Sequence, residues 1–156
     1  MRVEKDYKDF LSLLGAKKAK YLIVGGYAYS YHAEPRYTKD IDLLVEATEE
    51  NGAKVVAAIA EFWGIKPEVE PADFLRRDTI IQLGLAPVRI DIITSCAGIE
   101  FRSAWKNRIK AKYGDINVFF ISLKDLIKNK RAVGRDRDLL DAKYLERIKK
   151  ARSRRS

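Results

Sequence analysis

The chain has 156 residues, of which 47% are hydrophobic and 34% charged, and its formal net charge is +9. The length and composition predict a single folded domain over residues 1–156 and exclude a chain that is disordered throughout, while the positive charge favours polyanionic partners. No apolar run approaches the roughly 20 residues that cross a bilayer, the N-terminus has no apolar signal segment, and the lone cysteine allows no internal disulfide, so we expect a cytoplasmic protein without membrane contact.

Helical and strand patterns alternate in the first part of the chain. Apolar residues at helical spacing predict a helix over residues 4–14, and the apolar run Tyr21–Val24 predicts a buried central strand. The pair Gly25–Gly26 predicts a tight turn into a short helix over residues 27–33, which the following proline ends. Apolar residues from Ile41 to Val45 then predict a second strand.

The next segments predict a long helix and a hairpin. Thr48 is a typical N-cap for a helix over residues 49–63, and Gly64 is a typical residue to end it. We expect residues 65–69 to form an edge strand, because Pro67 keeps this segment out of the sheet centre. Two apolar runs joined at Ala86-Pro87 predict a β-hairpin. Its strands are residues 79–85 and 88–94.

The last third of the chain predicts a helix over residues 98–109, a strand over residues 116–121 and two C-terminal helices. Ser122 to Asp125 resembles a capping box that starts a helix to about Val133. The last helix, residues 136–150, is predicted from apolar residues that we expect to face the core. These are Leu139, Leu140, Tyr144, Leu145 and Ile148. The basic tail, about residues 147–156, is typical of a solvated chain end, with nucleic-acid contact as the alternative.

This order of elements predicts an α/β (α+β) fold, with a mixed β-sheet flanked by helices and followed by C-terminal helices. Asp40 and Asp42 are two residues apart in a predicted strand, so both carboxylates project to one face. Asp91 is a charged residue in the middle of an apolar run. If its strand pairs beside that of Asp40 and Asp42, three carboxylates converge, and Mg²⁺ or Mn²⁺ would offset their repulsion.

Residues just before these aspartates suit a phosphate group. Gly25 and Gly26 have no side chains, so a phosphate can approach the backbone and bind the N–H groups that open the following helix. Arg36 and Lys39 add positive charge next to the aspartates. The stretch therefore predicts a site that holds a nucleoside triphosphate and a divalent metal.

The spacing of these motifs resembles that of a known superfamily. Gly25-Gly26, thirteen intervening residues, Asp40-Ile-Asp42 and the later Asp91 resemble the nucleotidyltransferases related to DNA polymerase beta. The string GGYAYSYHAEPRYTKDIDLLV is similar to the minimal nucleotidyltransferases and the AbiEii-like toxin branch. The string ISLKDLIKNKRAVGRDRDLLDAKYLE resembles the C-terminal region of the AbiEii-like group. The resemblance spans roughly residues 21–146.

The resemblance implies a palm-like mixed sheet and transfer of a nucleoside monophosphate from an NTP to a hydroxyl of RNA, protein or a small molecule. Asp40 and Asp42 would bind metal, and Asp91 would help to deprotonate the hydroxyl. Gly25 and Gly26 would face the phosphates. Further nucleotide or substrate contacts are expected from Arg36, Thr38 and Lys130. A helical partner protein and a role in a toxin–antitoxin pair are also implied.

Other interpretations remain open from the sequence. The chain could be a weakly active or inactive member of the fold that binds nucleotide or nucleic acid with a partner. A metal-dependent phosphohydrolase is disfavoured because the chain has no histidine-rich metal set. Several residues have plainer explanations than a site. We expect a structural role for His32 at a helix end, an inert thiol at Cys96, one packed helix face for Tyr27 and Tyr31, and core positions for Trp63 and Trp105.

Overall fold

The computed structural model describes residues 1–155. Its helices are α1 (Lys5–Ala16), α2 (Gly25–His32), α3 (Glu49–Trp63), α4 (Phe101–Lys106), α5 (Leu123–Val133) and α6 (Asp136–Arg155), with a 3-10 turn, η1, over Pro71–Leu75. Its strands are β1 (Tyr21–Val24), β2 (Asp40–Val45), β3 (Ile80–Leu85), β4 (Val88–Ile93), β5 (Ile109–Tyr113) and β6 (Ile116–Phe120). None of the helices among these residues has the length and apolarity needed to span a membrane.

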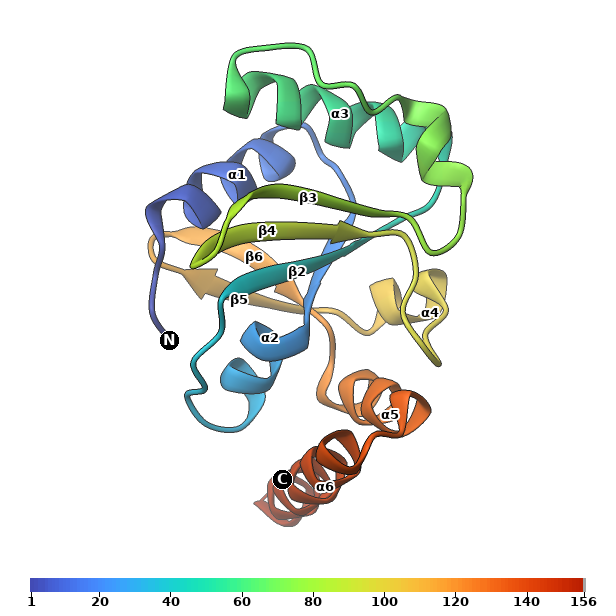
Figure 1. The fold of residues 1–156 in the computed structure, drawn as a ribbon. Coiled ribbons are helices and arrows are strands. Elements are labelled where there is room, and N and C mark those ends of the chain that lie inside the picture. Colours follow the sequence, from blue (N-terminus) through green and yellow to red (C-terminus); the bar gives the residue numbers. More distant parts are fainter. Residues whose placement is uncertain (156) are drawn as a thin grey trace.

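The strands form one mixed sheet in the order β3-β4-β2-β1-β6-β5. Helices α1 and α3 lie on one side of the sheet, and α2, α4, α5 and α6 lie on the other (Figure 1). The predicted α+β class, with a mixed sheet flanked by helices, is therefore confirmed.

Strand β1 forms the centre of the core, as its four apolar residues predict. All four are buried, and the strand pairs antiparallel with β2 and parallel with β6. Helix α1 packs on the sheet through its apolar stripe, which includes Tyr7, Phe10 and Leu14. Removal of this apolar surface from water is the main source of stability for such a layered fold.

Strands β2 and β4 are neighbours in the sheet and run parallel. They are not consecutive in the chain, because α3, η1 and β3 lie between them. In their register Asp40 pairs with Arg89 and Asp42 pairs with Asp91. Strand β3 pairs antiparallel with β4, which confirms the predicted hairpin. The fold thus brings two segments about fifty residues apart to directly opposed positions.

Local capping signals set several helix ends. The Thr48 hydroxyl accepts a hydrogen bond from the Asn51 N–H at 3.1 Å, and Gly64 ends α3 with φ of 74°. The Ser122 hydroxyl accepts from the Asp125 N–H at 3.1 Å and starts α5. The predicted ends of both helices are confirmed, because each rests on contacts within a few residues.

Other sequence predictions are wrong or incomplete. Residues 65–69 form no strand, and Trp63 is 48% exposed rather than buried in the core. Of the helix predicted over residues 98–109, only α4 (Phe101–Lys106) is helical. Ile109, the last residue of the predicted helix, is instead the first residue of the edge strand β5, which pairs with β6. Helix α2 starts at Gly25, directly after β1, so no separate glycine turn precedes it.

The last helix differs from its prediction in length and in orientation. It continues to Arg155, so residues 147–155 of the basic tail are helical rather than frayed. The predicted apolar face is only partly right, because Leu145 is buried but Leu139 and Leu140 are exposed while Asp138 and Asp141 are buried. Basic residues of neighbouring segments pair with these two carboxylates, which offsets the desolvation cost of burying them.

Candidate active site

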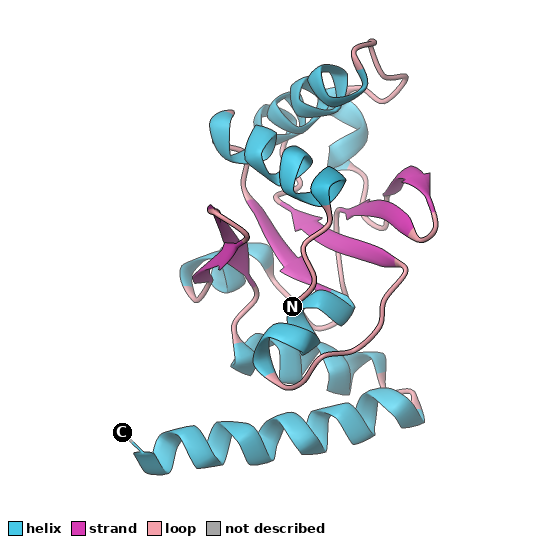
Figure 2. Cartoon of the chain, turned by 90° about the vertical axis from the view of Figure 1, so that its left-hand side faces the viewer, coloured by secondary structure: helices cyan, strands magenta, loops and turns pink. Residues whose placement is uncertain are grey.

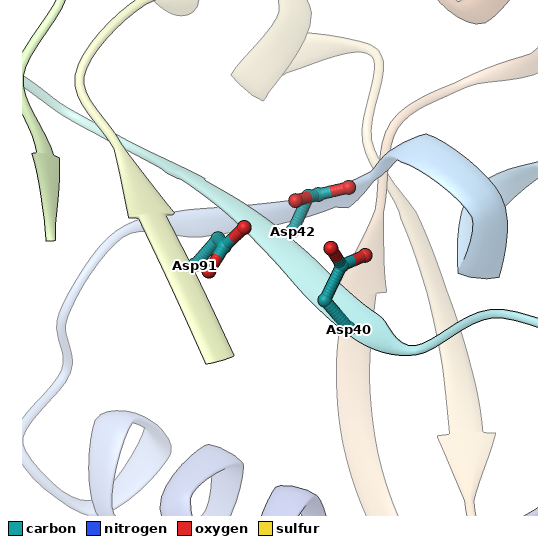
Figure 3. Close-up of side chains that lie close together, drawn as sticks. All are labelled: Asp40, Asp42 and Asp91. Atoms are coloured by element: carbon teal, nitrogen blue, oxygen red, sulfur yellow. The ribbon is translucent and has the colours of Figure 1, made fainter. Parts of the chain in front are cut away.

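Three aspartates converge on the face of the sheet that carries α2. Asp40 and Asp42 project from β2, and Asp91 projects from β4 beside them (Figure 3). Each offers a carboxylate oxygen, and these atoms all lie within 4.8 Å of one another. The sequence prediction that the three carboxylates come together therefore holds in the structure.

The strand register explains this convergence. Residues i and i+2 of a strand share a face, so Asp40 and Asp42 point the same way, while the residue between them, Ile41, is buried toward the other side. Asp91 is the direct parallel partner of Asp42 and is only 7% exposed. The cluster is thus held by the sheet itself rather than by a loop.

Arg89 belongs to this cluster, although sequence reasoning did not single it out. Its Nη2 donates to Asp40 Oδ2 at 2.8 Å and to Asp91 Oδ2 at 2.9 Å, and its Nε donates to Asp91 Oδ1 at 2.9 Å. The available signal was the Arg-x-Asp alternation of Arg89 and Asp91, which places both on one face of β4. Arg89 supplies one positive charge among three carboxyl groups.

The electrostatics of the cluster favour binding of a further cation. Burial, and then the charges of Asp40 and Asp91, raise the pKa of Asp42 to about 7, and Arg89 opposes this shift. Asp42 therefore carries a carboxylate that is only partly ionised near neutral pH. A set of closely spaced carboxylate oxygens without nitrogen or sulfur ligands fits a hard divalent cation such as Mg²⁺ or Mn²⁺.

The N-terminus of α2 lies against these carboxylates because its first two residues are glycines. Gly25 has φ of 65°, and a Cβ there would collide with the Asp42 carboxylate. A Cβ on Gly26 would lie 3.2 Å from Thr38 Cβ. No side chain caps the N-terminus of α2 within the described part of the chain, so its first N–H groups can bind an anion beside the cluster.

Thr38 holds the start of β2. Its hydroxyl donates to the Asp40 carbonyl oxygen at 2.5 Å and accepts from the Asp40 N–H at 3.2 Å. A hollow of about 390 Å³ lies next to this turn and is lined in part by Tyr27, Thr38 and Val88. Thr38 therefore lies between the carboxylate cluster and a space large enough for part of a substrate.

Arg36 and Lys130 come together, but on another carboxylate. Two Arg36 nitrogens donate to Asp141 at 2.8 and 2.9 Å, and Lys130 Nζ donates to Asp141 at 3.0 Å. The Arg36 guanidinium also stacks on Tyr29, 3.7 Å from the ring centroid. These contacts tie the loop before β2 to α5 and α6. A direct contact of Arg36 or Lys130 with nucleotide stays a prediction.

His32 and Cys96 have the structural character that the sequence predicts. His32 is 3% exposed at the end of α2 and donates from Nε2 to the Ile121 carbonyl at 2.7 Å, and burial lowers its pKa. Burial raises the pKa of the Cys96 thiol to about 11, so it is protonated at neutral pH and poorly nucleophilic. Neither residue supplies an obvious second reactive centre.

Comparison with known proteins gives one family. Residues 3–150 match a family model described as nucleotidyltransferase of unknown function (DUF6036), and the chain belongs to this family. No curated protein sequence matches the chain.

Proposed function

We propose that this member of the nucleotidyltransferase family is a divalent-metal-dependent enzyme that transfers a nucleoside monophosphate from an NTP to a hydroxyl acceptor. One observation carries the proposal: the oxygens of Asp40, Asp42 and Asp91 lie within 4.8 Å of one another beside the glycine start of α2. A cation site next to an anion site matches the charge pattern of a metal-bound triphosphate.

The residues have distinct roles in this scheme. Asp40 and Asp42 would hold divalent cations, which supply activation of the acceptor hydroxyl and neutralisation of the pyrophosphate. The N–H groups that open α2 would bind phosphate oxygens, with Gly25 and Gly26 allowing their close approach. The acceptor oxygen forms a bond to the α-phosphorus, pyrophosphate leaves, and Asp91 accepts the hydroxyl proton. Arg89 must release Asp91 for this step, because it donates two hydrogen bonds to that carboxylate.

The AbiEii-like branch is the finer assignment that we favour. Its support is the C-terminal string, whose charged residues form one connected unit in the fold. Lys130 pairs with Asp138 and Asp141, and Arg135 pairs with Asp138. On this assignment the acceptor is RNA or protein rather than a small molecule, and the chain acts as the toxin of a toxin–antitoxin pair with a helical partner in the cytoplasm.

Arg89 favours a second candidate function. A guanidinium that already pairs with two of the three carboxylates suits a weakly active or inactive member of the fold, which would bind nucleotide or nucleic acid without chemistry. The two candidates differ in whether label moves from the α-phosphate to an acceptor.

The deciding experiment offers purified protein each α-labelled NTP with Mg²⁺ or Mn²⁺, together with total RNA, a protein extract or the chain alone. We expect covalent label on an acceptor, and loss of that label in Asp42→Asn. Asp136→Asn is the matched control, because Asp136 is an exposed carboxylate at the start of α6. NTP binding without transfer to any acceptor supports the second candidate. Absence of both transfer and NTP binding would overturn the first candidate and leave only nucleic-acid binding to the second.

The toxin assignment has its own test. Induced expression of the wild-type chain in a bacterial host is expected to slow growth, and Asp42→Asn is expected to relieve this effect at equal protein level. Equal inhibition by both forms would assign the effect to protein overproduction and remove this support for the toxin role.

A further inference from the structure

The solvent side of α6 carries a row of basic residues that the candidate active site does not use. Asp138, Asp141, Ala142 and Leu145 are buried against the rest of the molecule. At about 100° per residue, Lys143, Arg147, Lys150 and Arg154 lie on the opposite side of the helix, and all four are exposed. Figure 2 shows α6 along one edge of the molecule, with the rest of the protein on only one side of it.

This row, residues 143, 147, 150 and 154, extends for about 16 Å at the helical rise of 1.5 Å per residue. Its four side chains make no ion pair within residues 1–155. By contrast, the basic residues that point inward, such as Arg36 and Lys130, have carboxylate partners. The outer row is therefore uncompensated positive charge on a rigid element.

A hollow lies along the same row. It has a volume of about 390 Å³ and is lined by Arg131 of α5 and by Lys143, Glu146, Arg147 and Lys150 of α6. Glu146 is its one acidic residue, and it pairs with Arg131 at 3.3 Å. The three remaining basic side chains surround a space in which phosphate oxygens can be bound by several donors at once.

We propose that this face of α6 binds the phosphodiester backbone of a nucleic acid. Evenly spaced cations on one helix face fit a polymer with regularly spaced negative charges. An acidic protein partner fits less well, because protein interfaces need a buried apolar centre, and the exposed apolar side chains of α6, Leu139, Leu140 and Tyr144, lie at the N-terminal end of the row rather than along it. A membrane surface fits less well for the same reason, since an interfacial helix buries an apolar face in lipid.

The face points away from the body of the protein, whereas β2 and β4, the strands that carry the three aspartates, lie on the other side of α2 and α5 from α6 (Figure 1). A nucleic acid bound here is therefore held at a distance from the carboxylate cluster. The inference goes beyond the proposed function, because binding at α6 requires neither nucleotide nor metal. The two proposals can fail separately. Nucleotidyl transfer without nucleic-acid binding at α6 would contradict only the present inference. Nucleic-acid binding at α6 without nucleotidyl transfer would contradict only the proposed function.

The test is fluorescence anisotropy of a labelled single-stranded RNA of about 20 nucleotides with the full chain, in EDTA, over a series of salt concentrations. We expect binding that weakens with salt, with a log–log slope of about −0.7 per phosphate contacted. Combined Lys143→Gln, Arg147→Gln and Lys150→Gln is expected to weaken binding about tenfold or more and to reduce the slope by about 2. The duplex of the same sequence shows which form of nucleic acid binds better.

The matched control combines Lys66→Gln, Lys110→Gln and Lys112→Gln, which removes the same charge from exposed positions on other elements. It is expected to keep most of the affinity. An equal loss of RNA affinity in the two triple variants would show that net charge alone causes the effect, and would overturn the proposal. Displacement of the RNA by polyglutamate at equal charge, or binding to anionic vesicles without binding to RNA, would also overturn it.

A second measurement needs no variant. Lysine acetylation of the wild-type chain, read by mass spectrometry with and without RNA, is expected to show protection of Lys143 and Lys150 but not of Lys110 and Lys112. Protection of Lys110 and Lys112 alone would contradict the proposed face.

Discussion

The guanidinium of Arg89 lies opposite Asp40 across the parallel pair of β2 and β4, with Nη2 2.8 Å from Asp40 Oδ2. The same guanidinium binds Asp91 through two further hydrogen bonds. Arg89 thus occupies the carboxylate oxygens that a divalent cation would use. Cation binding and the Arg89 contacts therefore compete for the same atoms.

We expect Arg89→Gln to bind Mn²⁺ about five- to tenfold more tightly than the wild type, because it removes a positive charge a few ångströms from the site. Isothermal titration calorimetry measures this affinity. Arg102→Gln, an exposed arginine of α4, is the control and should leave the affinity unchanged. Weaker Mn²⁺ binding in Arg89→Gln would mean that Arg89 orders the carboxylates rather than competing with metal.

Asp42→Asn should make the metal-free protein more stable at alkaline pH. The pKa of Asp42 in the folded protein is about 7, above its ordinary value of 3.8, so the folded state binds this proton more tightly than the unfolded chain does. Wild-type stability without metal therefore falls as pH rises from about 4 to 7. Asp42→Asn removes this loss, which we expect to stabilise the protein by about 1–3 kcal/mol at pH 8 and by almost nothing at pH 4.

Urea unfolding in EDTA at the two pH values measures this difference. Addition of Mg²⁺ at pH 8 should recover stability in the wild type and recover much less in Asp42→Asn. The control Asp136→Asn should change stability by less than about 0.5 kcal/mol at either pH. A variant that is less stable than the wild type at pH 8 would show that the Asp42 carboxylate is satisfied without metal.

Gly25→Ala should destabilise the protein by about 2–4 kcal/mol and abolish nucleotidyl transfer. The residue has a left-handed φ of 65°, and the added methyl group would displace the Asp42 carboxylate. Gly15→Ala is the matched control, since Gly15 lies within α1 with open space around its Cβ position. It should stabilise the protein by about 0.5 kcal/mol or more. Thermal unfolding of the two variants checks both the expected loss of stability in Gly25→Ala and the expected gain in Gly15→Ala.

Asp141→Asn should cost about 2 kcal/mol at pH 7, because it leaves Arg36 and Lys130 without their shared carboxylate. The hydrogen bonds from Arg36, and then those from Lys130, lower the pKa of Asp141 to about 2. Since this value is below the ordinary 3.8, the stabilisation is present above about pH 4 and is lost as pH falls toward 2. The difference in urea midpoint between variant and wild type should therefore shrink between pH 5 and pH 2.5.

The exposed pair of Lys5 and Asp9 supplies the comparison. Asp9→Asn removes an ion pair of 2.6 Å at the surface of α1 and should lower the urea midpoint much less than Asp141→Asn does. Equal costs for Asp9→Asn and Asp141→Asn would mean that the ion pairs between the loop before β2 and α6 add no more than a surface pair does.

Features that depend on short stretches of chain were predictable from the sequence. The ends of α3 follow from Thr48 and Gly64. The convergence of the three aspartates follows from the period-two spacing of Asp40 and Asp42 and from the charge of Asp91 within an apolar run. The alternation of Arg89 and Asp91 is visible in the sequence, but the contact of Arg89 with Asp40 was not predictable without the register of β2 on β4. That register is set by packing across the whole sheet, which no local pattern contains.

The errors arose where apolarity alone was used to assign a face. In α6, Leu139 and Leu140 are more apolar than Asp138 and Asp141, yet the aspartates are buried because Lys130, Arg36 and Arg135 pair with them. In β5 the alternation of Ile109, Ala111 and Tyr113 was present, but Ile109 was assigned to the end of a helix. In α6 one partner, Arg36, is distant in sequence, whereas β5 pairs with the adjacent strand β6, so the error at Ile109 was one of local assignment.

The parallel pairing of β2 with β4 also has a consequence for biosynthesis. A nascent chain of 60 residues already contains Asp40 and Asp42, but it lacks the strand that carries Asp91 and Arg89. The complete carboxylate cluster can therefore assemble only after β4 has left the ribosome and closed a loop of about fifty residues on β2. Until then a partly made chain lacks the complete candidate site, so formation of this site waits for completion of the sheet.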